Sequence, residues 1–291
     1  MKNINEKAYA KLNISLDVAN SRSDGYHDMI MVMQAVSLHD DVSITLNETG
    51  KLHADTGLYF IPGDERNLAV KAAKLFLEEI GDETTGAEIK ISKRIPIGAG
   101  MAGGSSDGAA VLRGMNRLFG SPLSRDRLIE VAERVGSDVP FCFIGGTALA
   151  EGKGERLTAL KSFPECRFVI CKPEFSISTP ELFKAIDGIK LRIHPDTAGI
   201  ISGIESGNLK HICRRVYNVF EDVPDRRLKV VPEIKRKLLD AGAECAIMTG
   251  TGSAVFGIFN PGTETDDICN ELKKEYGFCV TAEPVCECTL S

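Results

Sequence analysis

Apolar and polar residues alternate along residues 8–18, near the N-terminus. The apolar positions fall on every second residue, and the positions between them are Tyr9, Lys11, Asn13, Ser15 and Asp17. Successive side chains of a β-strand point to opposite faces of its sheet. The pattern therefore predicts a strand with one buried apolar face and one polar face.

Periodicity and end signals predict the other elements of the first half of the chain. Further strands are expected near residues 29–37, 42–46 and 87–95. Asn67 and Ser124 are typical N-cap residues, and a glycine follows each apolar helical pattern. Helices are therefore expected at residues 68–80, 105–119 and 125–135.

The second half begins with strand patterns near residues 147–151 and 167–172. Helical periodicity then covers residues 180–241, where Pro195, Pro224 and Pro232 are expected to divide it. The C-terminal segment is predicted to form two strands, a helix and a final strand, at residues 245–249, 253–259, 265–276 and 278–285. Strands mixed with segregated helices indicate the α+β class. We place a domain boundary near residue 160, which gives domains 1–160 and 161–291.

Composition narrows the class of protein further. The 291 residues are 43% apolar and 26% charged, which is the ordinary balance of a globular protein. A net charge of −6 excludes the basic footprint of a nucleic-acid-binding protein. The sequence shows neither an apolar run of membrane-spanning length nor a signal peptide, so we expect a cytoplasmic protein without a membrane partner. The nine cysteines lack zinc-site spacing, which favours reduced thiols.

A glycine-rich segment at residues 96–106, PIGAGMAGGSS, lies between a predicted strand and a predicted helix. Glycines let the backbone approach a ligand closely. The first turn of a helix offers unpaired N–H groups and the positive end of the helix dipole, which suit a phosphate. Ser105 and Ser106 could cap that helix or donate to phosphate oxygens. The segment therefore predicts a phosphate-binding loop.

Three better-known phosphate loops fit this segment poorly. A Walker loop requires a lysine after its glycines, and none occurs here. Gly98, Gly100 and Gly103 match the dinucleotide fingerprint. A Rossmann oxidoreductase also needs a second strand that ends in an acidic residue about 20 residues further on, and a helix is predicted there instead. The H-R-D and D-F-G motifs of protein kinases do not occur. The dinucleotide match is interpreted as accidental.

Several polar residues have an ordinary interpretation when each is taken alone. Lys11 and Asn13 share the polar face of the first strand, where a lysine is usually solvated. Asp138 precedes an uncharged segment and is typical of a helix cap. Tyr26 and His27 follow an Asp-Gly turn signal and could belong to a surface turn. None of these residues identifies a site by itself.

Five motifs taken together resemble the GHMP kinase superfamily. They are AKLN at residues 10–13, RSDGYH at 22–27, PIGAGMAGGSSD at 96–107, GSDVPF at 136–141 and TGTGS at 249–253. The pairing of AKLN with DGYH is most similar to the member that acts on a cytidine diphosphate-linked polyol, because DGYH belongs to its cytidine-binding side. The resemblance implies a two-domain fold, with an N-terminal ribosomal-protein-S5-like β/α domain and a C-terminal ferredoxin-like α/β domain.

The resemblance also implies a role for each motif. Lys11 and Asp138 would flank the acceptor hydroxyl group as the catalytic residues. The cytidylated substrate would be contacted by Asn13, Tyr26, His27, Thr179 and Phe183, with Tyr26 and Phe183 on opposite faces of cytosine. The ATP-binding residues would be Asn67 and Lys93 on the adenine side and, along the phosphates, Pro96, Ile97, Gly98, Ala99, Gly100, Met101, Ala102, Gly103, Gly104, Ser105 and Ser106. The loop at 249–253 would close over the glycine-rich segment.

The implied reaction transfers the γ-phosphoryl group of ATP to the 2-hydroxyl group of that polyol, in non-mevalonate isoprenoid synthesis and with Mg²⁺. Asp138 would accept the hydroxyl proton, and Lys11, if within about 4 Å, would lower the pKa of this carboxylate. The motifs do not identify the magnesium ligand, for which Glu151 and Glu155 are candidates by position only. Ala99 and Ala102 stand where a fully glycine loop is common, so backbone approach there would be tighter.

Other functions stay open at this point. The runner-up is another GHMP kinase, acting on homoserine, mevalonate or a sugar. A binding protein that has lost catalysis is disfavoured by the presence of both Lys11 and Asp138. A nucleotide-dependent dehydrogenase would require the fingerprint interpretation rejected above. We expect a monomer or homodimer whose partner is a small molecule.

Overall fold

The computed structural model describes residues 2–21, 25 and 27–286. Its strands are β1 (Asn3–Ser21), β2 (His27–Asn47), β3 (Leu52–Asp55), β4 (Gly86–Ser92), β5 (Thr147–Gly152), β6 (Arg156–Ala159), β7 (Arg167–Lys172), β8 (Cys245–Met248), β9 (Val255–Phe259) and β10 (Phe278–Ala282). One sheet has the order β3-β4-β2-β5-β6, with β1 also paired to β2, and the other has the order β10-β7-β9-β8. The expected domain boundary near residue 160 falls in the connection between β6 and β7.

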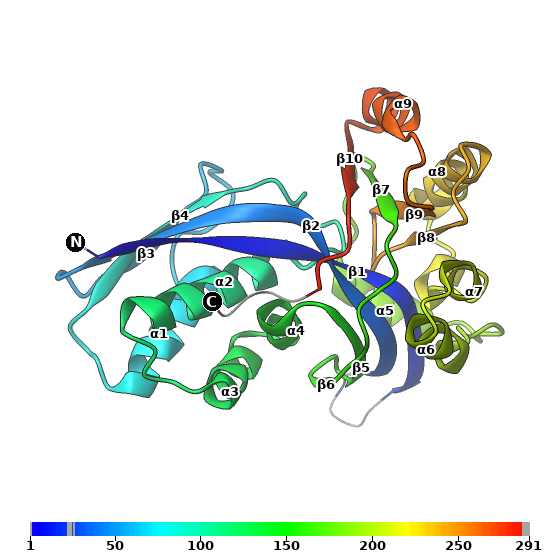
Figure 1. The fold of residues 1–291 in the computed structure, drawn as a ribbon. Helices are drawn as coiled ribbons and strands as arrows, with labels where there is room; N and C mark the ends of the chain where they lie inside the picture. Colours follow the sequence, from blue (N-terminus) through cyan, green and yellow to red (C-terminus); the bar gives the residue numbers. More distant parts are fainter. Residues whose placement is uncertain (1, 22–24, 26, 287–291) are drawn as a thin grey trace.

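Four helices cover one face of the first sheet (Figure 1). They are α1 (Leu68–Ile80), α2 (Gly103–Leu118), α3 (Arg125–Val135) and α4 (Val139–Ile144). The side chain of Asn67 caps α1 and that of Ser124 caps α3, as predicted. Gly81 ends α1 with a φ of 72°, a left-handed conformation that glycine adopts without a Cβ clash.

The remaining helices belong to the C-terminal half. They are α5 (Thr179–Ile186), α6 (Thr197–Glu205), α7 (Leu209–Cys213), α8 (Val230–Asp240) and α9 (Asp266–Tyr276), with 3₁₀ turns at Val219–Asp222 and Arg226–Lys229. Pro232 does not interrupt α8, contrary to the prediction, because it lies in the first turn, where backbone N–H groups have no partner within the helix. No helix in the described part of the chain is long and apolar enough to cross a membrane.

The two sheets are joined by apolar packing on one face of strand β7. Its side chains alternate between two apolar cores: Phe168 and Ile170 pack in the core that contains Leu12 and Ile14 of β1. Val169 and Cys171 pack in the other core, which includes residues of α8 and α9. Because the second sheet is buried on both faces, one of them against β1, the N-terminal strand becomes a central element of the molecule.

The prediction of one buried face for β1 is wrong. The register against β2 shifts between Tyr9 and Lys11 and again between Asn13 and Ser15. Such irregularities change which face a side chain occupies. Since other elements also cover the polar face, Lys11 is 5% exposed and Asn13 and Ser15 are fully buried.

Strand predictions failed at two other places. The segments 29–37 and 42–46 are parts of the single strand β2, which pairs with β4 near one end and with β5 near the other. The short strands β3 and β6 were not predicted. Four residues are too few for a clear alternation, so the sequence pattern gives little signal for them.

Candidate active site

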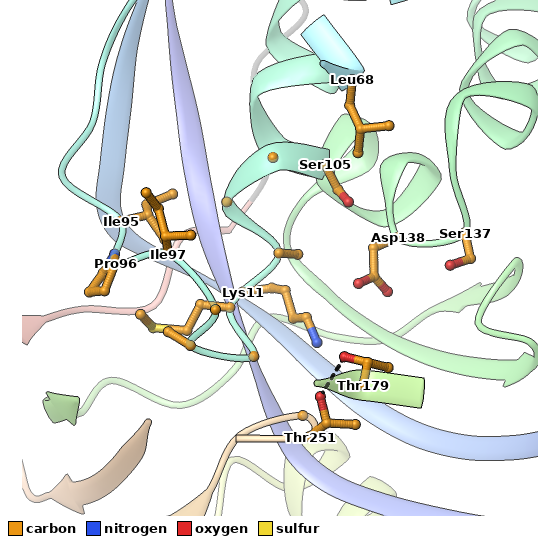
Figure 2. Close-up of a pocket in the computed structure, with 18 of the residues that line it drawn as sticks. Lys11, Leu68, Ile95, Pro96, Ile97, Ser105, Ser137, Asp138, Thr179 and Thr251 are labelled. Carbon is orange, nitrogen blue, oxygen red and sulfur yellow. Dashed lines mark hydrogen bonds between the residues drawn. The ribbon is translucent and has the colours of Figure 1, made fainter. Parts of the chain in front are cut away.

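A cleft of about 540 Å³ opens beside the glycine-rich segment (Figure 2). Residues 96–105 all line it, together with Lys11 from β1 and Asp138 from the start of α4. The loop at 250–252 and the beginning of α5 close its other side. Side chains that are more than a hundred residues apart in the sequence therefore face one space.

The glycine-rich segment leaves backbone N–H groups available to a ligand. Gly98, Gly100 and Ala102 all have a positive φ, which turns the chain sharply before α2. Ala102 is the N-cap of α2, and no side chain of the described residues caps the helix there. The expectation that Ser105 or Ser106 caps this helix is wrong, because both serines lie inside its first turn. The exposed end of α2 carries unpaired N–H groups and a positive dipole.

Ser105 and Ser106 have different surroundings. Ser105 lines the cleft. Ser106 is 1% exposed, and its hydroxyl group donates a 2.5 Å hydrogen bond to the carbonyl oxygen of Tyr9 and lies 3.3 Å from Cys142 Sγ. The structure thus places Ser106 behind the cleft wall, where it attaches α2 to β1.

The loop at 249–253 packs against the glycine-rich segment, as predicted. Thr249 Oγ1 donates to the carbonyl oxygen of Gly100 at 3.3 Å and accepts a hydrogen bond from the backbone N–H of Asn13 at 3.0 Å. A Cβ atom on Gly100 would lie 2.3 Å from the carbonyl oxygen of Thr249. Only a glycine permits this contact between the two halves of the molecule.

Lys11 and Asp138 point into the same cleft (Figure 2). The Lys11 ammonium group donates a 2.5 Å hydrogen bond to Asn13 Oδ1. Within the described residues Lys11 forms no ion pair with Asp138, so the close contact considered above is not present. Asp138 is the N-cap residue of α4, as the helix-cap interpretation expected, but its side chain makes no capping hydrogen bond in the described structure.

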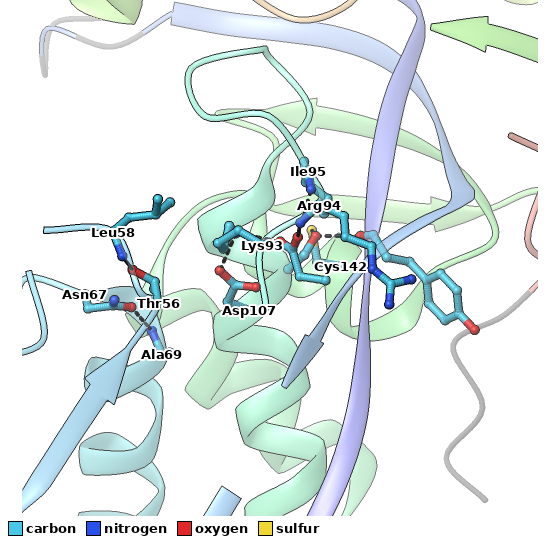
Figure 3. Close-up of polar contacts among 12 residues, drawn as sticks. Thr56, Leu58, Asn67, Ala69, Lys93, Arg94, Ile95, Asp107 and Cys142 are labelled. Atoms are coloured by element: carbon cyan, nitrogen blue, oxygen red, sulfur yellow. Dashed lines mark hydrogen bonds and ion pairs between the residues drawn. The ribbon is translucent and has the colours of Figure 1, made fainter. Parts of the chain in front are cut away.

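Lys93 lines the cleft and forms a buried charge cluster (Figure 3). Its ammonium group lies 2.5 Å from Asp40 Oδ2 and 2.7 Å from Asp107 Oδ2. Burial alone would lower the pKa of Lys93, but the attraction of Asp107 and Asp40 raises it instead. One cation therefore faces two carboxylates in a site of low polarity.

Asp107 is a carboxylate of this cluster whose charged form is disfavoured by burial. Burial raises the pKa of Asp107 to about 7, against the lowering effect of Lys93. Its Oδ1 atom is buried and has no hydrogen-bond partner among the described residues. Asn67 lies in the same part of the cleft, where it accepts from the N–H of Ala69 and donates to the carbonyl oxygen of Pro62.

A second cavity, of about 810 Å³, adjoins the first, and three of the five predicted substrate contacts line it: His27, Thr179 and Phe183. His27 Nε2 lies 2.7 Å from Asp187 Oδ1, and its ring stacks on Phe183 with centroids 4.9 Å apart. Thr179 Oγ1 shares a 2.9 Å hydrogen bond with Thr251 Oγ1. Asn13 is buried behind Lys11 rather than in either lining, and Tyr26 lies outside the described residues.

Several residues that line the cleft were not predicted from the sequence. Thr56, Ile61, Pro62 and Arg66 reach it from the connection between β3 and α1, and Asp107, Ser137 and Lys153 also line it. Lys153 could have been identified from the sequence, because it stands between two glycines in a charged turn. The apolar residues of the β3–α1 connection show no sequence pattern that indicates a role in the cleft.

No cluster of three or more His, Cys, Asp or Glu residues suited to a metal ion occurs at residues 2–21, 25 and 27–286. Glu155 lines the second cavity and Glu151 lines neither cavity. Neither of the carboxylates suggested by position therefore borders the glycine-rich segment.

Comparison with known proteins identifies two matching family models. The model described as the GHMP kinases N terminal domain matches residues 67–146. The model described as GHMP kinases C terminal matches residues 200–277. The first match contains the glycine-rich segment and Asp138.

Curated relatives cover most of the chain. A 4-diphosphocytidyl-2-C-methyl-D-erythritol kinase of Caldicellulosiruptor saccharolyticus is 46% identical over 87% of this chain and 87% of its own length. A kinase of the same name from Clostridium botulinum is 43% identical over 94% of this chain and 97% of its own length.

The solved structures of two kinases have folds similar to that of this chain. A crystal structure of 4-(cytidine 5'-diphospho)-2C-methyl-D-erythritol kinase has a TM-score of 0.81 and 30% identity, over 97% of this chain and 99% of that one. A homoserine kinase of Cytophaga hutchinsonii has a TM-score of 0.79 at 18% identity, over 99% of this chain and 96% of its own, which shows a common fold alone.

We predict that Gly100→Ala lowers the free energy of unfolding by at least about 1–2 kcal/mol, because Gly100 has a φ of 74° and its new Cβ would meet Thr249. Urea unfolding measures the effect. Gly104→Ala is the matched control, since its nearest new neighbour is 3.9 Å away and alanine favours a helix. Equal stability of the two variants would contradict the account.

Asp107→Asn is expected to stabilise the protein at pH 8 but not at pH 4. The folded pKa of about 7 exceeds the usual 3.8, so between these values the folded state binds the proton and the unfolded state does not. Stability therefore falls as the pH rises through this window, and the asparagine avoids that loss, of about 1–4 kcal/mol. Thermal unfolding at both pH values measures it, with the exposed Asp126→Asn as control. A gain independent of pH would refute the explanation.

Proposed function

This chain belongs to the GHMP kinases, and among them to the 4-diphosphocytidyl-2-C-methyl-D-erythritol kinase family. We therefore propose that it phosphorylates 4-diphosphocytidyl-2-C-methyl-D-erythritol. The γ-phosphoryl group of ATP would pass to the 2-hydroxyl group and leave ADP. The single observation that carries this proposal is the common cleft of the glycine-rich segment, Lys11 and Asp138. It provides a phosphate cradle and an acid–base group in one cleft.

The glycine-rich segment is suited to hold the triphosphate of ATP. The uncapped first turn of α2 offers N–H groups, and Gly103, Gly104 and Ser105 line the cleft there. Phosphoryl transfer passes through a loose transition state, so the protein contributes mainly positioning and charge stabilisation. Fixed backbone dipoles supply both without reorganisation during the reaction.

Asp138 and Lys11 are suited to the acceptor side. The Asp138 carboxylate, which is not used as a helix cap, would accept the hydroxyl proton as the new P–O bond forms. The Lys11 ammonium group would stabilise negative charge on the acceptor oxygen and the transferred phosphoryl group. Asn13 is a positioning residue, because its buried side chain holds that ammonium group in place.

Magnesium fits the oxygen donors of the cleft as an ion carried on the nucleotide. Mg²⁺ is commonly held by one or two protein oxygens together with phosphate oxygens and water. The Ser105 hydroxyl group, which lines the cleft in the first turn of α2, is the protein oxygen that would hold it. When bound, the ion neutralises charge on the phosphates.

The second cavity is suited to the cytidine part of the substrate. Phe183 lines both cavities and provides an aromatic surface there. In the present structure His27 stacks on this ring, so a cytosine on the same face would take the place of the histidine ring.

Asp138→Asn is expected to lower kcat by about 10²- to 10⁴-fold while the KM for ATP changes little, because the amide cannot accept the proton. A coupled assay of ADP release with the cytidylated substrate measures both constants. Asp267→Asn, on the surface of α9, is the control. Near-full turnover of Asp138→Asn would remove this residue from the chemistry, and faster turnover with homoserine or mevalonate would favour a different acceptor.

Phe183→Leu is expected to raise the KM for the cytidylated substrate by about 5- to 150-fold, since stacking of a base on an aromatic ring contributes about 1–3 kcal/mol. Leucine keeps apolar volume next to Phe220, which the Phe183 ring contacts edge-on. The KM for ATP serves as the internal control. An unchanged KM for the cytidylated substrate would show that cytosine does not lie on Phe183.

A further inference from the structure

The connection between β7 and α5, residues 173–178, lies against the glycine-rich segment. Ser176 Oγ donates a 3.4 Å hydrogen bond to the carbonyl oxygen of Ile97. A Cβ atom on Gly98 would lie 2.7 Å from Ser176 Oγ, so the connection leaves no room for a side chain there. Ile177 of the same connection lines the first cleft. The position of the connection therefore affects the first residues of the phosphate cradle.

Lys172, the last residue of β7, holds this connection with its side chain. Its ammonium group donates hydrogen bonds of 2.7 Å to the carbonyl oxygens of Pro173 and Phe175. The Phe175 carbonyl oxygen also accepts a 2.7 Å hydrogen bond from Ser253 Oγ. A carbonyl oxygen has two lone pairs, so both acceptor positions of Phe175 are used. The connection is thus attached at one point to β7 and to the loop at 249–253.

The charge of Lys172 is unusual for its surroundings. Lys172 is 7% exposed, and the partners of its ammonium group in the described structure are two backbone carbonyl oxygens. Burial lowers the pKa of Lys172, and the carboxylate of Glu174 opposes this only in part. An apolar side chain would avoid the cost of burying a charge, so stability alone does not account for the lysine.

We propose that Lys172 is a positioning residue for ATP binding. Its ammonium group fixes the backbone at Phe175 and Ser176. Ser176 in turn holds Ile97 and Gly98 in the conformation that receives the triphosphate. The proposal rests on the proposed function, because it takes the glycine-rich segment to bind ATP. N–H groups that are oriented before the ligand arrives bind it more tightly, since binding then needs no reorganisation.

The test measures binding of a non-hydrolysable ATP analogue with Mg²⁺ to the full-length protein by calorimetry. Lys172→Met should weaken this binding by about 3- to 30-fold, the range typical for loss of a supporting contact outside a ligand site. Lys172→Arg should keep part of the affinity, because a guanidinium group also donates to carbonyl oxygens. Lys161→Met, at an exposed ion pair with Glu205, should bind the analogue like the unmodified protein.

Calorimetry separates positioning from a loss of folded protein. Unfolded molecules reduce the measured number of sites, whereas a displaced glycine-rich segment raises the dissociation constant of the molecules that remain folded. Ser253→Ala removes the other donor to the Phe175 carbonyl oxygen and should also weaken binding. Its effect and that of Lys172→Met should not be additive, because both act on one carbonyl group.

Two results would overturn the role of Lys172. One is an unchanged dissociation constant in both Lys172→Met and Ser253→Ala. The other is a lower number of sites in Lys172→Met with the dissociation constant of the unmodified protein, which would assign the lysine to stability alone. An unmodified protein that does not bind the analogue would instead contradict the proposed function.

Discussion

The site depends on a backbone contact between two halves of the molecule. The glycine-rich segment is held from one side by the N–H of Lys11, which donates to the carbonyl oxygen of Met101, and from the other by Thr249. Gly100 and Gly250 approach so closely that side chains on either would clash. This three-way junction places the end of α2, the ammonium group of Lys11 and the second sheet around one cleft.

Buried polar groups then fix the chemistry of the cleft. At one end the Lys11–Asn13 pair orients an ammonium group towards the acceptor side. At the other end the Lys93 cluster ties β2 and α2 together at the cost of an excess carboxylate. Isolated charges in an apolar interior are unfavourable, so such clusters persist where packing or binding offsets their cost. The lysine of each cluster lines the first cleft.

Features determined by local sequence were predictable. The caps of α1 and α3 and the sharp turn of the glycine-rich segment follow from residue types within a few positions of one another. The glycine-rich segment, Lys11 and Asp138 were identified by motif, and the structure brings them together. The burial of Lys11 and Asn13 could not be predicted, because the elements that cover them belong to distant segments. The positions of Ser106 and Lys153 could not be predicted for the same reason. Contacts with residues that are distant in the sequence place Ser106 behind the cleft wall, whereas Lys153 lines the cleft.

A crystal structure with a non-hydrolysable ATP analogue and CDP bound together tests the central claim most directly. We expect the triphosphate to lie on the N–H groups of residues 98–105, with its terminal phosphate between Lys11 and Asp138 and the cytosine in the second cavity. A triphosphate bound away from residues 98–105, or a terminal phosphate remote from both Lys11 and Asp138, would contradict it.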